Sequence, residues 1–117
     1  MIKHSDITVA VCTFNGAQRI TPCLVALNQQ GVNFSVLVVD DGSTDATVAT
    51  IRQTLEQLNL RCQILELPEN VGIWMARQAA IDACQTEIIA FIDDDCRPTA
   101  GWSKELLSAW QAAKDST

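Results

Sequence analysis

The fold is decided by the stretch Ile88–Cys96 (IIAFIDDDC), in which a short apolar run passes directly into three consecutive carboxylates. A β-branched run of this length is typical of a buried strand in a parallel sheet. Carboxylates that follow such a strand lie in the crevice where open α/β sheets bind ligands. Because adjacent acids repel one another unless cations or hydrogen-bond donors answer them, the stretch favours a metal-dependent nucleotide site. A solvated acidic turn is the alternative interpretation.

The size and charge of the chain restrict the class of protein. Its 117 residues have the length of one domain, and 48% of them are hydrophobic, which is enough for a core. The formal net charge of −6 argues against a nucleic-acid partner, because such proteins present a basic face. A nucleotide ligand remains compatible with this charge, since a metal ion can mediate between acids and phosphates.

The five cysteines form no C-x-x-C pair, and most of them stand in apolar surroundings. We therefore expect reduced, buried thiols in a cytoplasmic protein, and neither a disulfide framework nor a zinc site. The sequence shows no signal peptide, and its apolar runs are too short to cross a bilayer. A position at the inner face of a membrane, through a membrane-anchored parent protein, is also compatible with the sequence.

Strand and helix patterns alternate along the whole chain. Alternation of this kind predicts a three-layer α/β/α domain with a mostly parallel sheet and right-handed crossovers. The expected strands are Ile7–Val11, Phe34–Val39, Arg61–Leu67 and Ile88–Ile92. The expected helices start near Thr21-Pro22, after Thr44 or Asp45, at Gly72 and at Trp102, and the last of them points Leu106, Leu107 and Trp110 inward.

Three of these strands end in polar side chains. Thr13 and Asn15 follow the first strand, Asp40 and Asp41 end the second, and residues 93–95 end the fourth. The carboxyl ends of parallel strands share one edge of the sheet, so these groups are expected to converge. The chain contains neither G-x-G-x-x-G nor G-x-x-x-x-G-K-[ST], so we expect side chains and loop backbone to hold a nucleotide.

Four motifs in order resemble those of family 2 glycosyltransferases of the GT-A fold. They are Cys12–Gly16, Val38–Asp45, Asn70–Gly72 with Ala76-Arg77, and Phe91–Asp95, and the resemblance spans about Ile7 to Pro98. It implies a Rossmann-like nucleotide-binding half that takes a sugar donor carried on UDP, dTDP or GDP. The acceptor would be a saccharide or a lipid-linked hydroxyl, with inversion at the anomeric carbon.

The resemblance also implies roles for individual residues. Asp41 would contact the base, and Thr13 and Asn15 would line the same pocket. Independently of the resemblance, the position of Asp41 and Asp40 at the end of the second strand suits either of them to accept hydrogen bonds from a base N–H or from ribose hydroxyls. Arg77 would lie near the base or the diphosphate. Asp93 and Asp95 would form the D-x-D signature, with Asp93 toward the ribose or the metal and Asp95 on a Mn²⁺ or Mg²⁺ ion. The middle position, Asp94, is also acidic, which leaves the division between neighbours open.

The physical chemistry of these residue types agrees with the implied roles. A divalent ion held between carboxylates and phosphates acts as a Lewis acid on the leaving diphosphate. A guanidinium matches phosphate oxygens, although a surface ion pair is the alternative for Arg77. The acids at 40 and 41 have the alternative of a simple turn before a capped helix, but capping needs only Thr44 or Asp45.

This chain differs from the members of the family mainly in its length. Family members continue into an acceptor-binding half that supplies the catalytic base, and nothing after Pro98 resembles it. We assign no catalytic base, and neither Glu105 nor Asp115 is favoured for that role. We expect residues 1–117 to be one donor-binding domain that ends before the acceptor-binding half, with self-association as a way to cover apolar surface.

Three other functions are alternatives to glycosyl transfer for this sequence. A non-catalytic nucleotide-binding module is the main alternative, because a base is missing. A nucleotidyltransferase is disfavoured, since such enzymes carry a glycine-rich basic loop after the first strand and this chain has only Gly16 and Arg19 there. A receiver-type signalling domain would need a later lysine, and no lysine lies between Lys3 and Lys104.

Overall fold

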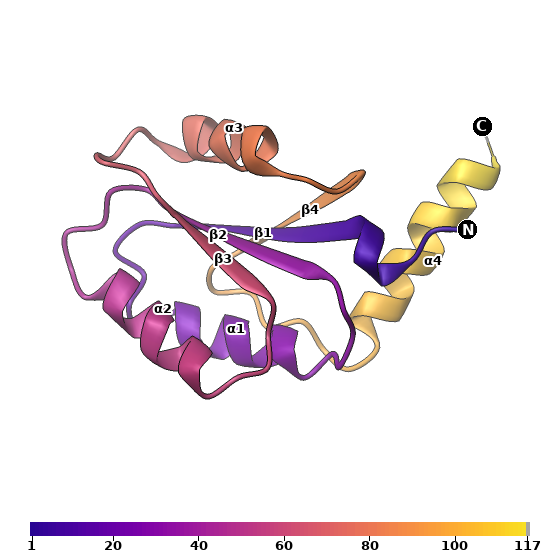
Figure 1. Cartoon of the computed structure of the whole chain (residues 1–117), viewed down its shortest axis with the longest axis horizontal. Coiled ribbons are helices and arrows are strands. Elements are labelled where there is room, and N and C mark those ends of the chain that lie inside the picture. Colours follow the sequence, from indigo (N-terminus) through magenta and orange to yellow (C-terminus); the bar gives the residue numbers. More distant parts are fainter. Residues whose placement is uncertain (117) are drawn as a thin grey trace.

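The computed structural model describes residues 1–116, and these residues alternate strands and helices as the sequence predicts (Figure 1). A short 3₁₀ turn at His4–Asp6 precedes the first strand. The strands are β1 (Ile7–Thr13), β2 (Ser35–Asp40), β3 (Cys62–Glu66) and β4 (Ile88–Asp93). The helices are α1 (Ile20–Asn28), α2 (Thr47–Glu56), α3 (Ile73–Ala83) and α4 (Trp102–Asp115).

All strand pairs in the sheet are parallel, and the strand order is β3-β2-β1-β4. The chain moves outward from β1 through β2 to β3 and then returns to the other side of β1 with β4. Ligands of open α/β sheets bind where the strand order reverses in this way. In the register, Cys12 of β1 stands opposite Asp93, and Thr13 stands opposite Asp40. The polar ends of β1, β2 and β4 therefore share one edge.

Helices cover both faces of the sheet, which confirms the three-layer α/β/α architecture. Figure 1 shows α1 and α2 on the lower face and α3 on the upper face. The lower layer is the larger: Val9 and Val11 of β1 pack there with Leu24, Leu27 and Ile51 of the two helices. The upper layer is built from the smaller set Ala10, Leu37, Val39, Ala76 and Ala80. Its alanines are fully buried, so α3 packs close to the sheet.

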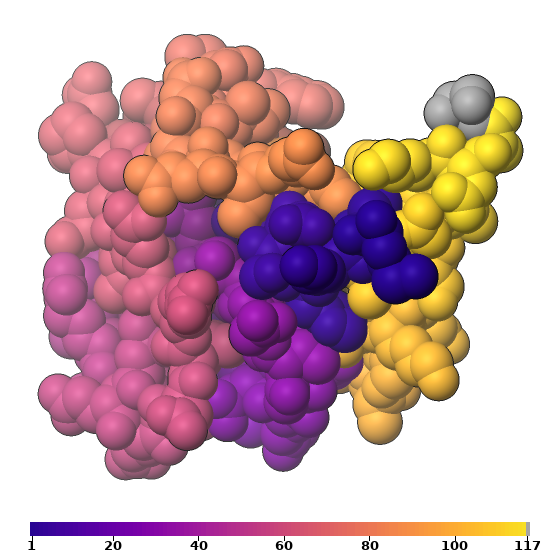
Figure 2. Space-filling model, turned by 45° about the vertical axis from the view of Figure 1, so that its right-hand side comes forward, coloured from indigo at the N-terminus to yellow at the C-terminus, as the bar shows by residue number. Residues whose placement is uncertain are grey.

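Helix α4 lies beside the start of the chain, and Figure 2 shows the N-terminal segment in contact with it. The main-chain N–H of Ile2 donates to Gln111 Oε1 at 2.8 Å. The Trp102 ring meets Phe34 edge to face, with 6.4 Å between ring centroids. Leu106 and Leu107 pack against the lower core, as predicted. The predicted inward position of Trp110 is wrong: 41% of this residue is exposed.

Helix α1 begins before Thr21-Pro22, which was the alternative start for it, and the first residue of helix α2 bonds to Asp45, one of its two predicted caps. Helix α1 begins at Ile20, so Thr21 is not its cap, and Pro22 lies in the first turn, where its missing N–H costs no hydrogen bond. Helix α2 begins at Thr47, whose N–H donates to Asp45 Oδ1 at 3.0 Å. The hydrogen bond from the Thr47 hydroxyl is the main cause that lowers the pKa of the Asp45 carboxyl, and the bond from the Thr47 N–H lowers it further.

The cysteines are free thiols, as expected, but only Cys23 is fully buried and the other four are half-buried. Burial raises the pKa of both Cys23 and Cys62 to about 12. None of the helices within residues 1–116 combines the length and the apolar character that a membrane span requires.

Candidate functional site

A cavity of about 240 Å³ opens at the carboxyl edge of the sheet, between the ends of β1 and β2 and the start of α3. Its wall combines main chain, small apolar side chains and a few polar groups. The lining residues are Cys12, Thr13, Phe14, Asp41, Asn70, Gly72, Ile73 and Ala76. Two residues predicted from the sequence, Thr13 and Asp41, therefore meet in one cavity. Burial raises the pKa of the Cys12 thiol in this wall, which keeps the thiol protonated.

A second cavity, of about 290 Å³, lies at the opposite edge of the sheet and includes Thr8, Arg61 and Cys84 in its wall. No carboxylate lines it. A site for a metal ion and a diphosphate needs hard oxygen ligands, so the carboxyl edge is the candidate despite its smaller cavity.

Asp41 is held in place by the loop that leads into α3. Its Oδ1 accepts the N–H of Val71 at 2.8 Å, and its Oδ2 accepts the N–H of Gly72 at 3.0 Å and the Asn70 amide at 3.0 Å. The side chain is buried, but Oδ1 accepts only one bond and keeps capacity for another. Asp41 therefore shapes the cavity wall and presents one oxygen that can accept a further donor.

Asp40 is buried and does not line the cavity. Its Oδ2 accepts the N–H of Ser43 at 3.4 Å, and its buried Oδ1 has no hydrogen-bond partner among residues 1–116. Buried carboxylate oxygens are nearly always paired, so an unpaired one is unusual. The structure thus distinguishes the two neighbouring acids: Asp41 borders the cavity, and Asp40 is buried outside its lining.

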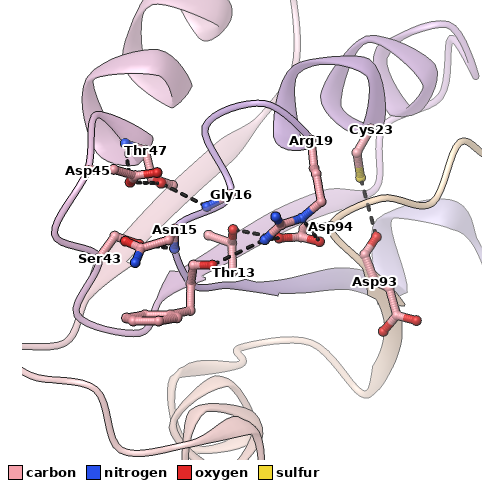
Figure 3. Close-up of polar contacts among 11 residues, drawn as sticks. Thr13, Asn15, Gly16, Arg19, Cys23, Ser43, Asp45, Thr47, Asp93 and Asp94 are labelled. Atoms are coloured by element: carbon pink, nitrogen blue, oxygen red, sulfur yellow. Dashed lines mark hydrogen bonds and ion pairs between the residues drawn. The ribbon is translucent and has the colours of Figure 1, made fainter.

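Asn15 joins two loops and is absent from the cavity wall. Its backbone is left-handed, with φ of 49°, and its Oδ1 accepts the N–H of Thr44 at 2.9 Å. Its own N–H donates to Ser43 Oγ at 2.9 Å (Figure 3). Asparagine tolerates the left-handed region better than most residues, which explains its place at this turn. The side chain fixes the loop after β1 against the loop after β2.

The middle carboxylate of the acidic stretch, Asp94, is bound to the loop after β1. Figure 3 shows the Arg19 guanidinium lying against it, with Nε 3.1 Å from Oδ1 and Nη2 3.1 Å from Oδ2. The hydroxyl of Thr13 donates to Oδ2 at 2.8 Å. The hydrogen bond to Asp94, reinforced by the charge of that carboxylate, raises the pKa of Arg19 above its ordinary value.

The outer carboxylates of the stretch are exposed to solvent. Asp95 makes no hydrogen bond or ion pair with any residue of 1–116, and Asp93 lies 4.0 Å from Arg77 Nη2. The Arg77 guanidinium carbon stands 5.6 Å from the centre of the Trp74 ring and 5.7 Å from that of Phe91. Two cation–π contacts thus hold a guanidinium beside Asp93 at the sheet edge.

The donor set fits a divalent ion that also binds a ligand phosphate. Asp93 and Asp95 offer hard carboxylate oxygens, which suit Mg²⁺ and Mn²⁺. Within residues 1–116 no three histidine, cysteine or acidic side chains converge on one point. Mg²⁺ is commonly held by one or two carboxylates together with substrate phosphates, and two accessible carboxylates match that pattern.

Several residues that build this edge were assigned no role from the sequence, although Gly16 and Asn70 stand within the motifs found there. Arg19 and Asn70 act through contacts between loops that are far apart in the chain, and only the fold brings them together. Gly16 is also part of the site, because a Cβ there would lie 2.2 Å from Thr13 Oγ1 and 2.6 Å from Asp94 Oδ2. A signal for Arg19 existed in the composition: with eight lysines and arginines against fourteen acids, each cation is a candidate partner for a buried acid.

The sequence has relatives of known identity. The sequence model of glycosyl transferase family 2 matches residues 8–117. The chain is 34% identical over 105 residues to glycosyltransferase AglE of Haloferax volcanii, which covers 87% of this chain and 34% of that protein. It is 37% identical over 94 residues to succinoglycan biosynthesis protein ExoO of Rhizobium meliloti, which covers 80% of this chain and 26% of that protein.

Solved structures with the same fold carry ligands. TarS 1–349 of S. aureus in complex with UDP-GlcNAc matches with a TM-score of 0.80 and 27% identity, over 91% of this chain and 31% of that one. Mannosyltransferase PcManGT of Pyrobaculum calidifontis, in complex with GDP-Man and Mn²⁺, matches with a TM-score of 0.80 and 28% identity. The match covers 89% of this chain and 31% of that one. The expected GT-A fold is confirmed by these similarities.

The chain spans about a third or less of the length of these relatives. Within that span, the family match includes every motif found in the sequence from Cys12 to Asp95. The chain belongs to glycosyltransferase family 2 and has its nucleotide-sugar-binding fold.

Proposed function

We propose that this chain is the donor-binding part of a metal-dependent glycosyltransferase that moves a sugar, with inversion, from a nucleoside diphosphate to a hydroxyl acceptor. The observation that carries the proposal is the meeting of three features at one sheet edge. They are the cavity bordered by Asp41, the exposed carboxylates Asp93 and Asp95, and the guanidinium of Arg77.

The cavity suits the nucleobase. Asp41 Oδ1 has capacity for one more hydrogen bond, which a base N–H can donate. Phe14, Ile73 and Ala76 give the cavity the apolar walls that a flat aromatic ring needs. The complexes of TarS with UDP-GlcNAc and of PcManGT with GDP-Man support a nucleoside diphosphate sugar as the donor class. UDP, dTDP and GDP remain the candidate carriers.

The outer acids and Arg77 suit the ribose and the diphosphate. Asp95 would hold Mn²⁺ or Mg²⁺, and Asp93 would bind the ribose hydroxyls or share the metal. When bound, the metal supplies Lewis-acid stabilisation of the charge that grows on the diphosphate as it leaves. Arg77, kept beside Asp93 by two aromatic rings, would add charge-assisted hydrogen bonds to phosphate oxygens. Mn²⁺ in the PcManGT complex supports a divalent cofactor.

Calorimetric titration tests the proposal. The protein is titrated with UDP, dTDP and GDP, with and without Mn²⁺, beside Asp95→Ala and the control Asp115→Ala on the far helix α4. We expect one nucleotide to bind in a metal-dependent way, with binding lost in Asp95→Ala and kept in Asp115→Ala. Failure of all three nucleotides to bind a folded protein would overturn the proposal. A transfer assay with bound donor then separates a transferase from a non-catalytic nucleotide-binding module.

The exposed face of α3 suits self-association. Ile73, Trp74, Met75 and Ile81 are exposed along this helix, a density of apolar side chains that is typical of contact surfaces. We expect sedimentation velocity to show concentration-dependent dimers, which Ile81→Lys weakens because it places a charge at the end of α3 remote from Asp93. A monomer at all concentrations would contradict this part of the proposal.

A further inference from the structure

The three carboxylates of the acidic stretch are not equivalent in the structure. The Asp94 side chain is 13% exposed and that of Asp93 is 77% exposed. The Arg19 guanidinium donates one hydrogen bond to each carboxylate oxygen of Asp94, and the Thr13 hydroxyl donates a third bond to this carboxylate at 2.8 Å. Two parallel N–H···O bonds from one guanidinium make the strongest common ion-pair geometry in proteins. Asp94 is therefore engaged by the protein itself.

The loop at Gly16 leaves room for the contact between Asp94, Thr13 and Arg19. Gly16 leaves open the space that the Thr13 hydroxyl and the Asp94 carboxylate occupy, and a Cβ would come within 2.2 Å and 2.6 Å of their oxygens. Its φ is not among the positive values in this chain, so backbone conformation does not account for a glycine. The N–H of Gly16 donates to Thr47 Oγ1 at 2.9 Å, which fixes the loop on α2. The loop after β1 is thus fitted to one carboxylate of the acidic stretch.

The ion pair between Asp94 and Arg19 lowers the number of carboxylates that the acidic stretch can offer to a metal ion. With Asp94 paired to Arg19, only Asp93 and Asp95 remain exposed at the end of β4. Two carboxylates without further protein ligands bind Mg²⁺ or Mn²⁺ weakly, and oxygens of a bound phosphate commonly complete the coordination. If Asp94 were released from Arg19, it would offer the cation a third carboxylate even without a nucleotide.

We propose that Arg19 and Thr13 withhold Asp94 from the metal, so that this site binds a divalent cation tightly only together with a nucleoside diphosphate. The proposal rests on the proposed function, because it assigns the metal to the same donor site. Arg19 is then a positioning residue: it touches neither donor nor metal and acts through Asp94. By linkage, the metal and the diphosphate must raise each other's affinity by the same factor.

A double-mutant cycle with Mn²⁺ alone tests the withholding of Asp94. Calorimetry measures Mn²⁺ affinity without nucleotide for the wild type, Arg19→Gln, Asp94→Asn and the Arg19→Gln/Asp94→Asn double variant. We expect weak binding in the wild type and about tenfold tighter binding in Arg19→Gln, where a third carboxylate is released. The gain should vanish in the double variant. Arg19→Lys, which keeps the charge but loses the two-point grip, should fall between Arg19→Gln and the wild type.

A purely structural role for Arg19 would lower the unfolding temperature without tightening Mn²⁺ binding. Unchanged or weaker Mn²⁺ binding in a folded Arg19→Gln protein would therefore overturn the inference. So would a gain that persists in the double variant, because Asp94 would then not be its source. The same titrations with UDP, dTDP or GDP present should show a coupling factor between metal and nucleotide that is smaller in Arg19→Gln than in the wild type.

The two proposals fail in different ways in this experiment. If no nucleotide binds the wild type under any condition, the proposed function fails, and the gain in Arg19→Gln still reports whether Asp94 was withheld. If nucleotide and metal bind together but Arg19→Gln shows no gain, the proposed function stands and this inference fails. Thermal melts of every variant confirm that each comparison is made between folded proteins.

Discussion

Asp41 accepts a hydrogen bond from the main chain of Gly72, although 31 residues separate the two. Asp41 directly follows the last residue of β2, and Gly72 is the residue from which α3 begins, so one side chain joins the end of the second strand to the third helix. A carboxylate close to the amino end of a helix also faces the positive end of its dipole. The wall of the cavity at the carboxyl edge of the sheet therefore depends on this contact.

Removal of the Asp41 carboxylate should destabilise the protein. Asp41→Ala leaves the N–H groups of Val71 and Gly72 without their partner, and we expect a loss of about 2 kcal/mol in the free energy of unfolding. Asp41→Asn keeps an acceptor oxygen and should lose about half as much. Urea unfolding measures both. Equal unfolding midpoints for the wild type and Asp41→Ala would contradict this role.

Arg77 should contribute to binding of the diphosphate and not of the nucleoside. Arg77→Ala should weaken UDP binding about tenfold and leave uridine binding nearly unchanged, because charge-assisted hydrogen bonds to phosphate are lost. Arg77→Lys should recover only part of the affinity, since a point charge lacks the fork geometry. Arg52→Ala is the matched control, because Arg52 pairs with Glu66 on an exposed surface. A parallel loss for uridine would indicate damage to the cavity instead.

The turn at Gly42 should tolerate no side chain. Its φ is +68°, and a Cβ would lie 2.3 Å from the carbonyl carbon of Glu69 and 2.4 Å from the nitrogen of Asn70. Gly31 has a similar φ of +66° and nothing within 4 Å, so Gly31→Ala isolates the cost of the backbone conformation, about 1 kcal/mol. We expect Gly42→Ala to cost at least about 2 kcal/mol more in urea unfolding. Similar losses for the two variants would show that the loop at 69–70 moves aside freely.

The thiols should react with alkylating reagents in a fixed order. Burial opposes ionisation of Cys84, but hydrogen bonds with Thr86 and Thr8 outweigh it and lower the pKa of this thiol. Burial raises the pKa of Cys23 and Cys62 to about 12. Because the thiolate is the reactive form, Cys84 should be labelled at a lower pH than Cys23 or Cys62. Mass spectrometry after brief iodoacetamide treatment across a pH series checks the order, with Cys84→Ser as control. Labelling of native Cys23 before Cys84 would refute it.

Most of the fold could be predicted because its signals are local. Each β-branched run forms a strand within one or two residues of its expected ends, and the alternating order dictates a parallel sheet. The errors arise where local signals compete. Thr21-Pro22 is a good helix start in sequence, but Gly16 offers its carbonyl to the N–H groups of Arg19 and Ile20, so the helix begins earlier. Trp110 fits the periodicity of α4, yet it stays exposed while Trp102, Leu106 and Leu107 of the same helix pack against the core.

The position of the candidate site could be predicted from the sequence, but the roles of its individual residues could not. The strand ends put Thr13, Asp41 and Asp93 on one edge in any parallel arrangement. The difference between Asp93, Asp94 and Asp95 depends on which carboxylate Arg19 reaches, and that contact spans 75 positions. Likewise, Asn15 was expected in the base pocket, and its bonds to residues 43 and 44 follow from the pairing of two loops. Contacts between distant loops carry no local pattern.

The position of β1 in the middle of the sheet has a consequence for how the protein folds. β1 pairs with β2 early in the chain but with β4 only through residues 88–93. Pairings between distant segments are slow to form, because much chain must be ordered first. During synthesis the strand that carries the acidic stretch therefore joins the sheet last. A polypeptide stopped before residue 88 would leave one edge of the largely apolar strand β1 unpaired, which favours aggregation.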